Sequence, residues 1–211
     1  MAYTLLWIMP STIMETPSSN LNQQIAERVR MLRSEQGLSL DALAIKSGVS
    51  RSMISLIERG ESSPTAVVLD KLAAGLGVTL PALFDAAASA KATQGPLARR
   101  DEQPQWRDPD SGYVRRNISP AGIRQPMQIV EVQFPAGERV TFETSARNMN
   151  VYQQVWVLEG AIDITLGPER YQLRQGDCLA MQLDRPIMFH NPTRRTTRYA
   201  IVIASEPYGR R

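Results

Sequence analysis

The sequence has very few of the residues from which disulfides and imidazole sites are built. Its 211 residues include one cysteine, Cys178, and one histidine, His190. A single cysteine excludes a disulfide within the chain and favours a reducing compartment, so we expect a cytoplasmic protein in which Cys178 is a small buried residue. A single histidine excludes any site that needs several imidazoles from one chain.

Long apolar runs are missing as well. The apolar stretch from Leu5 to Met9 is too short for a membrane span or a signal-peptide core, and no basic residue precedes it. We therefore predict that residues 1–20 form a flexible tail and that the protein has no membrane partner.

The sequence also has no large excess of charge of either sign. Its formal net charge is +3, and residues 21–86 carry as many acidic as basic side chains. Bulk charge therefore gives only weak support for nucleic-acid binding. The hydrophobic content of 43% and the length suit two small packed domains rather than a disordered chain.

Residues 21–86 show the spacing of short amphipathic helices. Asn20 or Asn22 is placed to cap a first helix that ends before Gly37. Thr65 is placed at the start of a fourth helix, and a short fifth segment follows it. Four or five short helices in this span predict a compact all-α domain.

The segment 40–59 has the pattern of a helix-turn-helix. Ala44 is small enough to let two helices cross closely, and Gly48 tolerates the positive φ that the turn needs. Ser39 and Ser50 are placed as N-caps, and apolar residues spaced i, i+3 give the second helix one buried face. Its other face is free and polar, which is the shape that enters a DNA major groove. That face carries Arg51, Ser52, Ser55, Leu56 and Arg59.

After residue 86 the pattern changes from helices to turns and strands. Residues 87–112 are rich in proline, small and charged residues, and they predict a linker that docks, if at all, through Trp106. Residues 113–207 contain short apolar runs separated by turns, with no helical period. The chain is therefore predicted to be multi-domain, with an all-α bundle followed by an all-β sandwich or barrel.

The string RVRMLRSEQGLSLDALAIKSGVSRSMISLIERGESSPTAVVLDKLAAGLGV closely resembles the DNA-binding domain of the lambda and Cro type repressors, which is grouped with the bacterial XRE regulators. The resemblance implies that the start of the third helix reads base edges, where Leu56 is limited to touching a thymine methyl. It also implies a structural ion pair between Arg33 and Glu58. The implied base readers are Arg51, Ser52 and Ser55; the implied phosphate contacts are Ser39, Arg59, Ser62 and Ser63, with Ser50 a cap that a phosphate can share.

Residues 113–205 resemble a cupin, a small double-sheet barrel, in the strings PAGERVTFE, YQQVWVLEGAIDI, RQGDCLAM and RPIMFHN. A cupin that binds iron, manganese or zinc carries three histidines and a glutamate in its motifs. The four corresponding positions here are Glu143, Ser145, Gln153 and Ile187. His190 lies three residues beyond the last of them. We therefore expect no metal and no cofactor.

A metal-free cupin can still hold a small organic molecule in the mouth of its barrel. The candidate ligand-binding residues are Gln153, Val155, Trp156, Met181 and Met188. Strand alternation allows only some of them to face inward. A barrel that only dimerises the chain is the other interpretation that stays open.

These patterns predict a sequence-specific DNA-binding transcriptional regulator that is not an enzyme. It is expected to bind a two-fold related operator on double-stranded DNA as a homodimer, with a cupin that dimerises the chains and senses a small-molecule effector. Two alternatives stay open. One is a metal-dependent cupin oxygenase or epoxidase fused to a helix-turn-helix domain, and the other is an antitoxin or adaptor whose cupin binds a protein.

Overall fold

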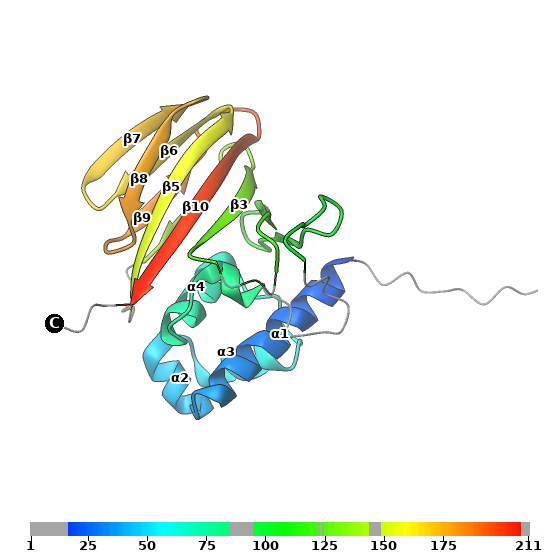
Figure 1. The fold of residues 1–211 in the computed structure, drawn as a ribbon. Coiled ribbons are helices and arrows are strands. Elements are labelled where there is room, and N and C mark those ends of the chain that lie inside the picture. Colours follow the sequence, from blue (N-terminus) through cyan, green and yellow to red (C-terminus); the bar gives the residue numbers. More distant parts are fainter. Residues whose placement is uncertain (1–16, 85–94, 122, 124, 144–148, 208–211) are drawn as a thin grey trace, which may run out of the picture.

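The structure is a computed structural model that describes residues 17–84, 95–121, 123, 125–143 and 149–207. Its helices come first in the chain and its strands follow, so the predicted order of an all-α part and an all-β part is confirmed (Figure 1). None of the described helices is long and apolar enough to cross a membrane. Most of the predicted N-terminal tail lies outside the described residues, and residues 17–20 begin the first helix.

The helical part consists of four α-helices and one short 3-10 helix within the described residues. Their bounds are α1 (Pro17–Glu35), α2 (Leu40–Ser47), α3 (Arg51–Glu58), α4 (Ala66–Gly75) and η1 (Leu80–Leu83). The predicted caps Asn20 and Asn22 are wrong, because both lie inside α1. The helix begins earlier, at Pro17, where a proline is tolerated since the first helical N–H groups have no partner within the helix.

The two short helices of the helix-turn-helix are capped as the sequence predicts. The Ser39 Oγ accepts a hydrogen bond from the Ala42 backbone N–H at 3.1 Å, and the Ser50 Oγ accepts one from Met53 at 3.3 Å. Gly48 has a φ of 68°, in the left-handed region that favours glycine. These contacts fix the start of α2, the turn and the start of α3.

A close contact between α2 and α4 lies at a small residue of α2 other than Ala44. Ala44 is only partly buried, whereas Ser47 is buried against Gly75 of α4. A Cβ added to Gly75 would lie 2.8 Å from the Cβ of Ser47, which is shorter than side chains tolerate. The absence of a side chain at Gly75 therefore lets α2 and α4 pack tightly.

The all-β part contains two antiparallel sheets that face each other, which confirms the expected double-sheet cupin architecture. The six-stranded sheet has the order β1-β2-β3-β10-β5-β8, and the four-stranded sheet has the order β4-β9-β6-β7. The strands are β1 (Gln105–Arg107), β2 (Val114–Asn117), β3 (Met127–Phe134), β4 (Arg139–Phe142), β5 (Met149–Glu159), β6 (Ala161–Leu166), β7 (Glu169–Arg174), β8 (Cys178–Gln182), β9 (Ile187–His190) and β10 (Thr197–Pro207).

The predicted linker spans residues 87–112, and its second half is packed into the fold. Strand β1 pairs with β2 in the six-stranded sheet, and its central residue, Trp106, is only 4% exposed. The buried carboxylate of Asp108 accepts a hydrogen bond from the Ala66 backbone N–H at 2.8 Å, at the start of α4. This segment therefore joins the helices to the barrel through buried contacts.

A chain of aromatic rings runs from the helical part into the barrel. Phe84 lies 5.8 Å from Trp106, and Trp106 lies 5.9 Å from Tyr113, measured between ring centroids. Tyr113 in turn lies 5.7 Å from Phe134 of β3. Because these rings belong to one buried cluster, the two parts share a hydrophobic core.

Candidate DNA-binding face and junction cavity

Helix α3 buries one side and exposes the other. Ile54 and Ile57 are buried in the helical core, at 0% and 1% exposure. Helix α4 lies next to the strands, whereas α2 and α3 lie on the side of α4 away from them (Figure 1). We call five exposed or half-exposed side chains of α3 and its C-cap the reading face: Arg51, Ser52, Ser55, Leu56 and Arg59.

Arg51 is the most open cation on the reading face. Its side chain is 65% exposed, and its Nε lies 3.3 Å from the Asp41 carboxylate, which is 72% exposed. An exposed ion pair of this kind contributes little free energy, because water and salt screen both charges. Arg51 is therefore able to leave Asp41 for a base edge.

Arg59 and Ser55 are brought together by the structure. The Arg59 Nη1 donates a hydrogen bond to the Ser55 Oγ at 2.5 Å. Its Nε and Nη2 donate to the two oxygens of Glu61 at 2.8 and 2.7 Å. This pairing raises the pKa of Arg59 and lowers the pKa of Glu61. Glu61 is not among the residues predicted from the sequence, and Arg59 must exchange this carboxylate before it can contact a phosphate.

The remaining predicted contact residues have structural bonds of their own. The Ser50 Oγ lies 3.2 Å from the Ser52 Oγ, and Ser63 accepts a hydrogen bond from the Asn22 amide at 2.8 Å. The Ser62 hydroxyl donates to the Met53 sulfur at 3.8 Å. All these hydroxyls except that of the half-buried Ser62 are on exposed residues, so they are open to a phosphate as well.

The ion pair implied by the repressor resemblance is present. The Arg33 Nε and Nη2 donate to the two carboxylate oxygens of Glu58 at 2.6 and 2.8 Å, and Nη1 donates to the Leu38 carbonyl at 2.8 Å. Two parallel bonds of this kind fix both distance and orientation. The pair joins α1 to the end of α3 and so sets the position of the reading face.

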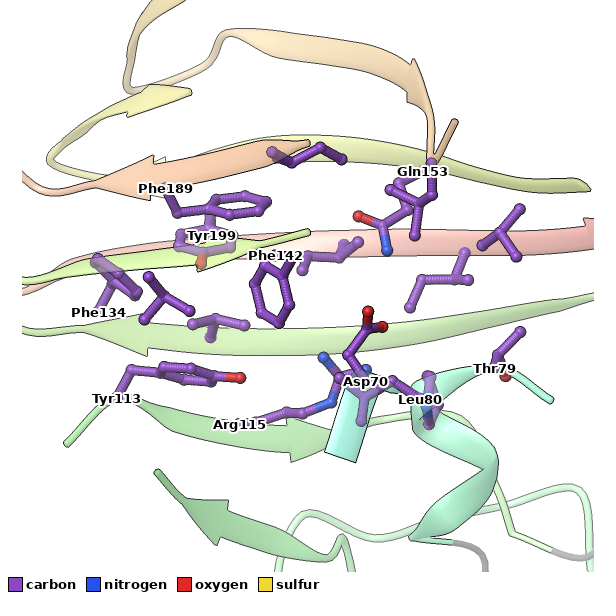
Figure 2. Close-up of a pocket in the computed structure, with 18 of the residues that line it drawn as sticks. Asp70, Thr79, Leu80, Tyr113, Arg115, Phe134, Phe142, Gln153, Phe189 and Tyr199 are labelled. Atoms are coloured by element: carbon purple, nitrogen blue, oxygen red, sulfur yellow. The ribbon is translucent and has the colours of Figure 1, made fainter. Parts of the chain in front are cut away.

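A cavity of about 60 Å³ lies between the helical part and the inside of the barrel, and we call it the junction cavity. About 10–15 Å³ holds one water molecule, so the space suits a few waters or a small organic molecule. Figure 2 shows its lining side chains, which come from both parts of the chain. The helical part contributes Asp70, Thr79, Leu80 and Pro81, and the barrel contributes Tyr113, Arg115, Phe142, Gln153, Phe189 and Tyr199 among others.

Only one of the predicted ligand-binding residues lines this cavity, namely Gln153. Trp156 is 52% exposed, because three positions along a strand separate it from Gln153 and place it on the opposite face. Met188 points away as well, since its neighbours Ile187 and Phe189 line the cavity. Met181 is buried on the inner face but does not line the cavity, and neither does Val155. The ligand-binding roles of Trp156, Met181 and Met188 therefore stay predictions without support from this cavity.

The positions that correspond to cupin metal ligands lie together where the structure describes them. Glu143, Gln153 and Ile187 all line the junction cavity, and Ser145 lies outside the described residues. Glu143 is held by Lys71 of α4 at 2.8 Å, and this ion pair lowers the pKa of Glu143. Among the described residues there is no group of three or more histidine, cysteine, aspartate or glutamate side chains able to hold a metal.

His190 points away from the junction cavity. It follows Phe189 on β9, and alternation places its side chain on the outer face of the four-stranded sheet. There its Nδ1 lies 3.9 Å from the buried carboxylate of Asp163, which also accepts a hydrogen bond from Arg170 at 2.6 Å. His190 therefore lies beside the ion pair of Asp163 and Arg170.

The sequence analysis missed the most unusual residue of the junction cavity, Arg115. Its side chain is 5% exposed and lies 5.8 Å from the ring of Phe84. Burial lowers the pKa of its guanidinium, and nearby Tyr113 and Asp70 act in the opposite direction. An arginine stays charged under these conditions, because its unperturbed pKa is far above neutrality. One signal was available: two consecutive arginines in a strand must point to opposite faces, so one of them faces inward.

The outer face of the six-stranded sheet exposes apolar side chains. Register places Trp156 directly opposite Cys178 on this face, and both are exposed. The expectation that Cys178 is buried is therefore wrong, because β8 turns it to the outside. We call this surface the outer sheet face; it includes the exposed side chains of Met127, Ile129, Tyr152, Trp156 and Cys178.

The chain is similar to known regulators over most of its length. A family model described as helix-turn-helix, HTH_3, matches residues 29–83. The HTH-type transcriptional regulator SutR of Escherichia coli (strain K12) is 26% identical over 185 residues, which are 87% of this chain and 96% of SutR. The uncharacterised HTH-type transcriptional regulator y4dJ of Sinorhizobium fredii is 33% identical over 60 residues, 28% of this chain and 78% of that protein. The crystal structure of an HTH_3 family transcriptional regulator from Vibrio cholerae aligns with a TM-score of 0.71 at 27% identity, covering 92% of this chain and 99% of that one.

Proposed function

The chain belongs to the XRE-type helix-turn-helix family of transcriptional regulators, here with a C-terminal cupin domain, and we propose that it binds a two-fold related operator as a homodimer. The observation that supports this most directly is the reading face. It combines an open arginine with small hydroxyl side chains on a helix that stands on the far side of α4 from the barrel (Figure 1). The proposed DNA-binding unit is residues 21–86, and the proposed dimerising unit is residues 113–207.

The proposed base contacts lie at the start of α3. Arg51 has the length and the fork of donors to bond the O6 and N7 of a guanine in the major groove. Ser52 and Ser55 are short enough to bond a neighbouring base edge once α3 lies in the groove. Leu56 is half-buried and can offer only apolar contact. Ser39, Ser50, Arg59, Ser62 and Ser63 are the proposed phosphate contacts.

The outer sheet face supports the proposed homodimer. A single recognition helix reads too few base pairs for useful specificity, and regulators of this kind work in pairs. An exposed patch with aromatic and apolar side chains on an otherwise polar surface is typical of a protein–protein interface. Trp156 and Tyr152 supply that chemistry on β5. We propose that two copies of this chain meet through the outer sheet face.

We propose that the cupin is a regulatory domain rather than an enzyme. Gln153 stands where a metal-binding cupin has its glutamate and Ile187 stands where it has a histidine; a glutamine is a poor metal ligand and an isoleucine cannot bind a metal. The protein would then act in the cytoplasm on double-stranded DNA, with the cupin sensing a small molecule. Metal analysis of the purified full-length protein tests this: a stoichiometric transition metal that is lost on Glu143→Ala would favour an oxygenase.

The experiment that tests the whole proposal combines DNA footprinting with light scattering. Genome-wide mapping of bound sites first supplies the operator. We expect a dimer in solution and two protected half-sites whose centres lie about 34–36 Å apart, because two α3 helices then meet successive major grooves on one side of the DNA. A monomer that protects a single half-site would contradict the proposal. A stable protein partner in place of a second copy would favour the adaptor alternative.

A further inference from the structure

One edge of the Arg115 guanidinium has no acceptor within the described part of the chain. Its Nε and Nη2 are both buried, and neither donates a hydrogen bond to a described residue. A buried donor without an acceptor is costly, and the cost is larger when the group is charged. Its neighbour Arg116 shows the usual solution, because the Arg116 Nη2 donates to Glu131 at 2.8 Å and Nη1 donates to Gln103 at 2.6 Å.

The two unpaired nitrogens form the side of a guanidinium that binds a carboxylate. Nε and Nη2 point in the same direction, so one carboxylate can accept from both at once. The same protein uses this edge elsewhere. Arg33 binds both oxygens of Glu58 through its Nε and Nη2, and Arg59 binds Glu61 in the same way.

The junction cavity offers a largely apolar space next to Arg115. Arg115 lines it together with aromatic rings from facing strands, and Gln153 points into it from the opposite wall (Figure 2). The lining also includes the carboxylates of Asp70 and Glu143. Glu143 is already paired with Lys71, and one guanidinium carries a single positive charge, which a singly charged anion matches better than a doubly charged phosphate.

We propose that the junction cavity binds a small organic carboxylate with an apolar tail, whose carboxylate accepts hydrogen bonds from the Nε and Nη2 of Arg115. This names the chemical class of the small molecule that the cupin senses, so its regulatory meaning rests on the proposed function. The site differs from the ligand positions that the sequence predicts, since it uses β2 and the helical part rather than Trp156, Met181 and Met188.

The position of the cavity allows a bound ligand to affect the reading face through the helices between them. Asp70 and Leu80 belong to the helical part, and Arg115 and Gln153 belong to the barrel, so a bound molecule would touch both. Both nitrogens of the Arg115 edge are buried, so a ligand that reaches them must displace side chains at this junction. Helix α4 carries Asp70 and packs against α2 at Gly75. A shift of α4 therefore passes directly to the helix-turn-helix.

Isothermal titration calorimetry on the full-length protein tests the proposal without DNA. The probes are butanoate and 3-methylbutanoate, with butanamide as the uncharged match of the first and valine as the α-amino counterpart of the second. We expect the two carboxylates to bind and butanamide not to bind. Binding by valine as well would show that the site accepts an added ammonium group, and it would still support a carboxylate site.

Two variants assign the binding to the edge of Arg115. Arg115→Lys keeps the charge but loses the paired donors, and we expect the dissociation constant for butanoate to rise at least about tenfold, since charged hydrogen bonds are lost. Arg115→Met should abolish binding. Arg107→Met is the matched control, because Arg107 is an exposed arginine on the neighbouring strand, and we expect its dissociation constant to stay within about twofold of wild type.

Two results would overturn the proposal. One is the absence of heat with both carboxylates on the wild-type protein, which needs no variant and therefore does not depend on how any variant folds. The other is equal butanoate affinity in wild type and Arg115→Lys. Neither result bears on operator binding, because DNA is not present in the titration, so failure of the carboxylate site and failure of the proposed regulator are told apart.

Discussion

The helical part and the barrel differ in how completely their buried polar side chains are hydrogen-bonded. In the helical part, the largely buried Arg33 is bonded through all three guanidinium nitrogens, and the buried Ser47 Oγ donates to the Leu43 carbonyl at 2.7 Å. Among the described residues, the buried side-chain nitrogens and oxygens that have no hydrogen-bond partner belong to Arg115, Asn117 and Arg198, all in the barrel.

This difference matches two kinds of binding site: an exposed face on a filled core, and a cavity inside a barrel. In the helical part, every buried side-chain nitrogen and oxygen of the described residues has a hydrogen-bond partner, and the proposed functional groups lie on the reading face. The barrel keeps an incompletely bonded charge inside, next to an apolar space. A filled core holds a helix rigidly in one position for DNA. Buried donors without acceptors are costly, and a ligand that supplies the acceptors removes that cost.

The largest expected effect tests whether the two parts are separable at all. Trp106→Ala should lower the free energy of unfolding of the whole chain by about 3–5 kcal/mol, because it removes a buried ring that touches Phe84 and Tyr113. Urea unfolding followed by circular dichroism measures this. Ile45→Ala is the control, since an apolar side chain on α2 at 86% exposure, away from the outer sheet face, should change stability little. Equal losses in the two variants would show that the junction is not a shared core.

The next effect tests the outer sheet face. Trp156→Glu should weaken the homodimer by about 2 kcal/mol or more, because an exposed tryptophan at the centre of an interface is a typical hot spot and a buried unpaired carboxylate is costly there. Sedimentation equilibrium measures the change. Gln172→Glu on β7 adds the same charge on the other sheet and should leave the dimer intact. An unchanged dimer in Trp156→Glu would move the interface elsewhere.

A somewhat smaller effect is expected on the reading face. Arg51→Ala should weaken specific operator binding by about 1–3 kcal/mol, with no loss of stability, because it removes a base contact and no core contact. Fluorescence anisotropy with the mapped operator measures the affinity. Arg174→Ala, an exposed arginine on β7, controls for the loss of one positive charge. Equal affinity of wild type and Arg51→Ala would remove Arg51 from the readers.

The smallest effect concerns the ion pair across the junction. Lys71 lowers the pKa of Glu143, so the pair stabilises the folded chain above the ordinary carboxyl pKa of 4.5 and loses this effect as the pH falls through the lowered value. Glu143→Gln should therefore lower the melting temperature slightly at pH 7 and by less at pH 4. Because Glu143 is exposed, the difference should shrink in high salt. A difference that grows towards acid would contradict this assignment.

The helical part was predicted well from the sequence because its signals are local. A cap, a turn glycine and a buried helix stripe each depend on residues within a few positions, as at Ser50, Gly48 and Ile54. The start of α1 was misplaced because several residues before Asn22 are also compatible with a first turn. The contact between Ser47 and Gly75 was missed because it joins residues that are distant in sequence.

The candidate ligand site was predicted poorly because strand faces depend on register. Side chains alternate between the two faces of a strand, and the pairing of distant strands decides which of them face inward, so the outward positions of Trp156 and Cys178 do not follow from the sequence. Arg115 was missed for a further reason. It lies near the start of the predicted barrel, and only the pairing of β2 with β1 and β3 decides that its side chain, rather than that of Arg116, faces the inside.

The bond from Asp108 to the start of α4 has a consequence for the order of folding. The Ala66 amide takes its acceptor from a residue 42 positions further along the chain. During synthesis α4 emerges before that acceptor exists, so its first turn is completed only when the β1 segment has left the ribosome. A growing chain that stops before residue 108 would therefore hold α4, and the tight contact of α4 with α2, less firmly than the finished protein does.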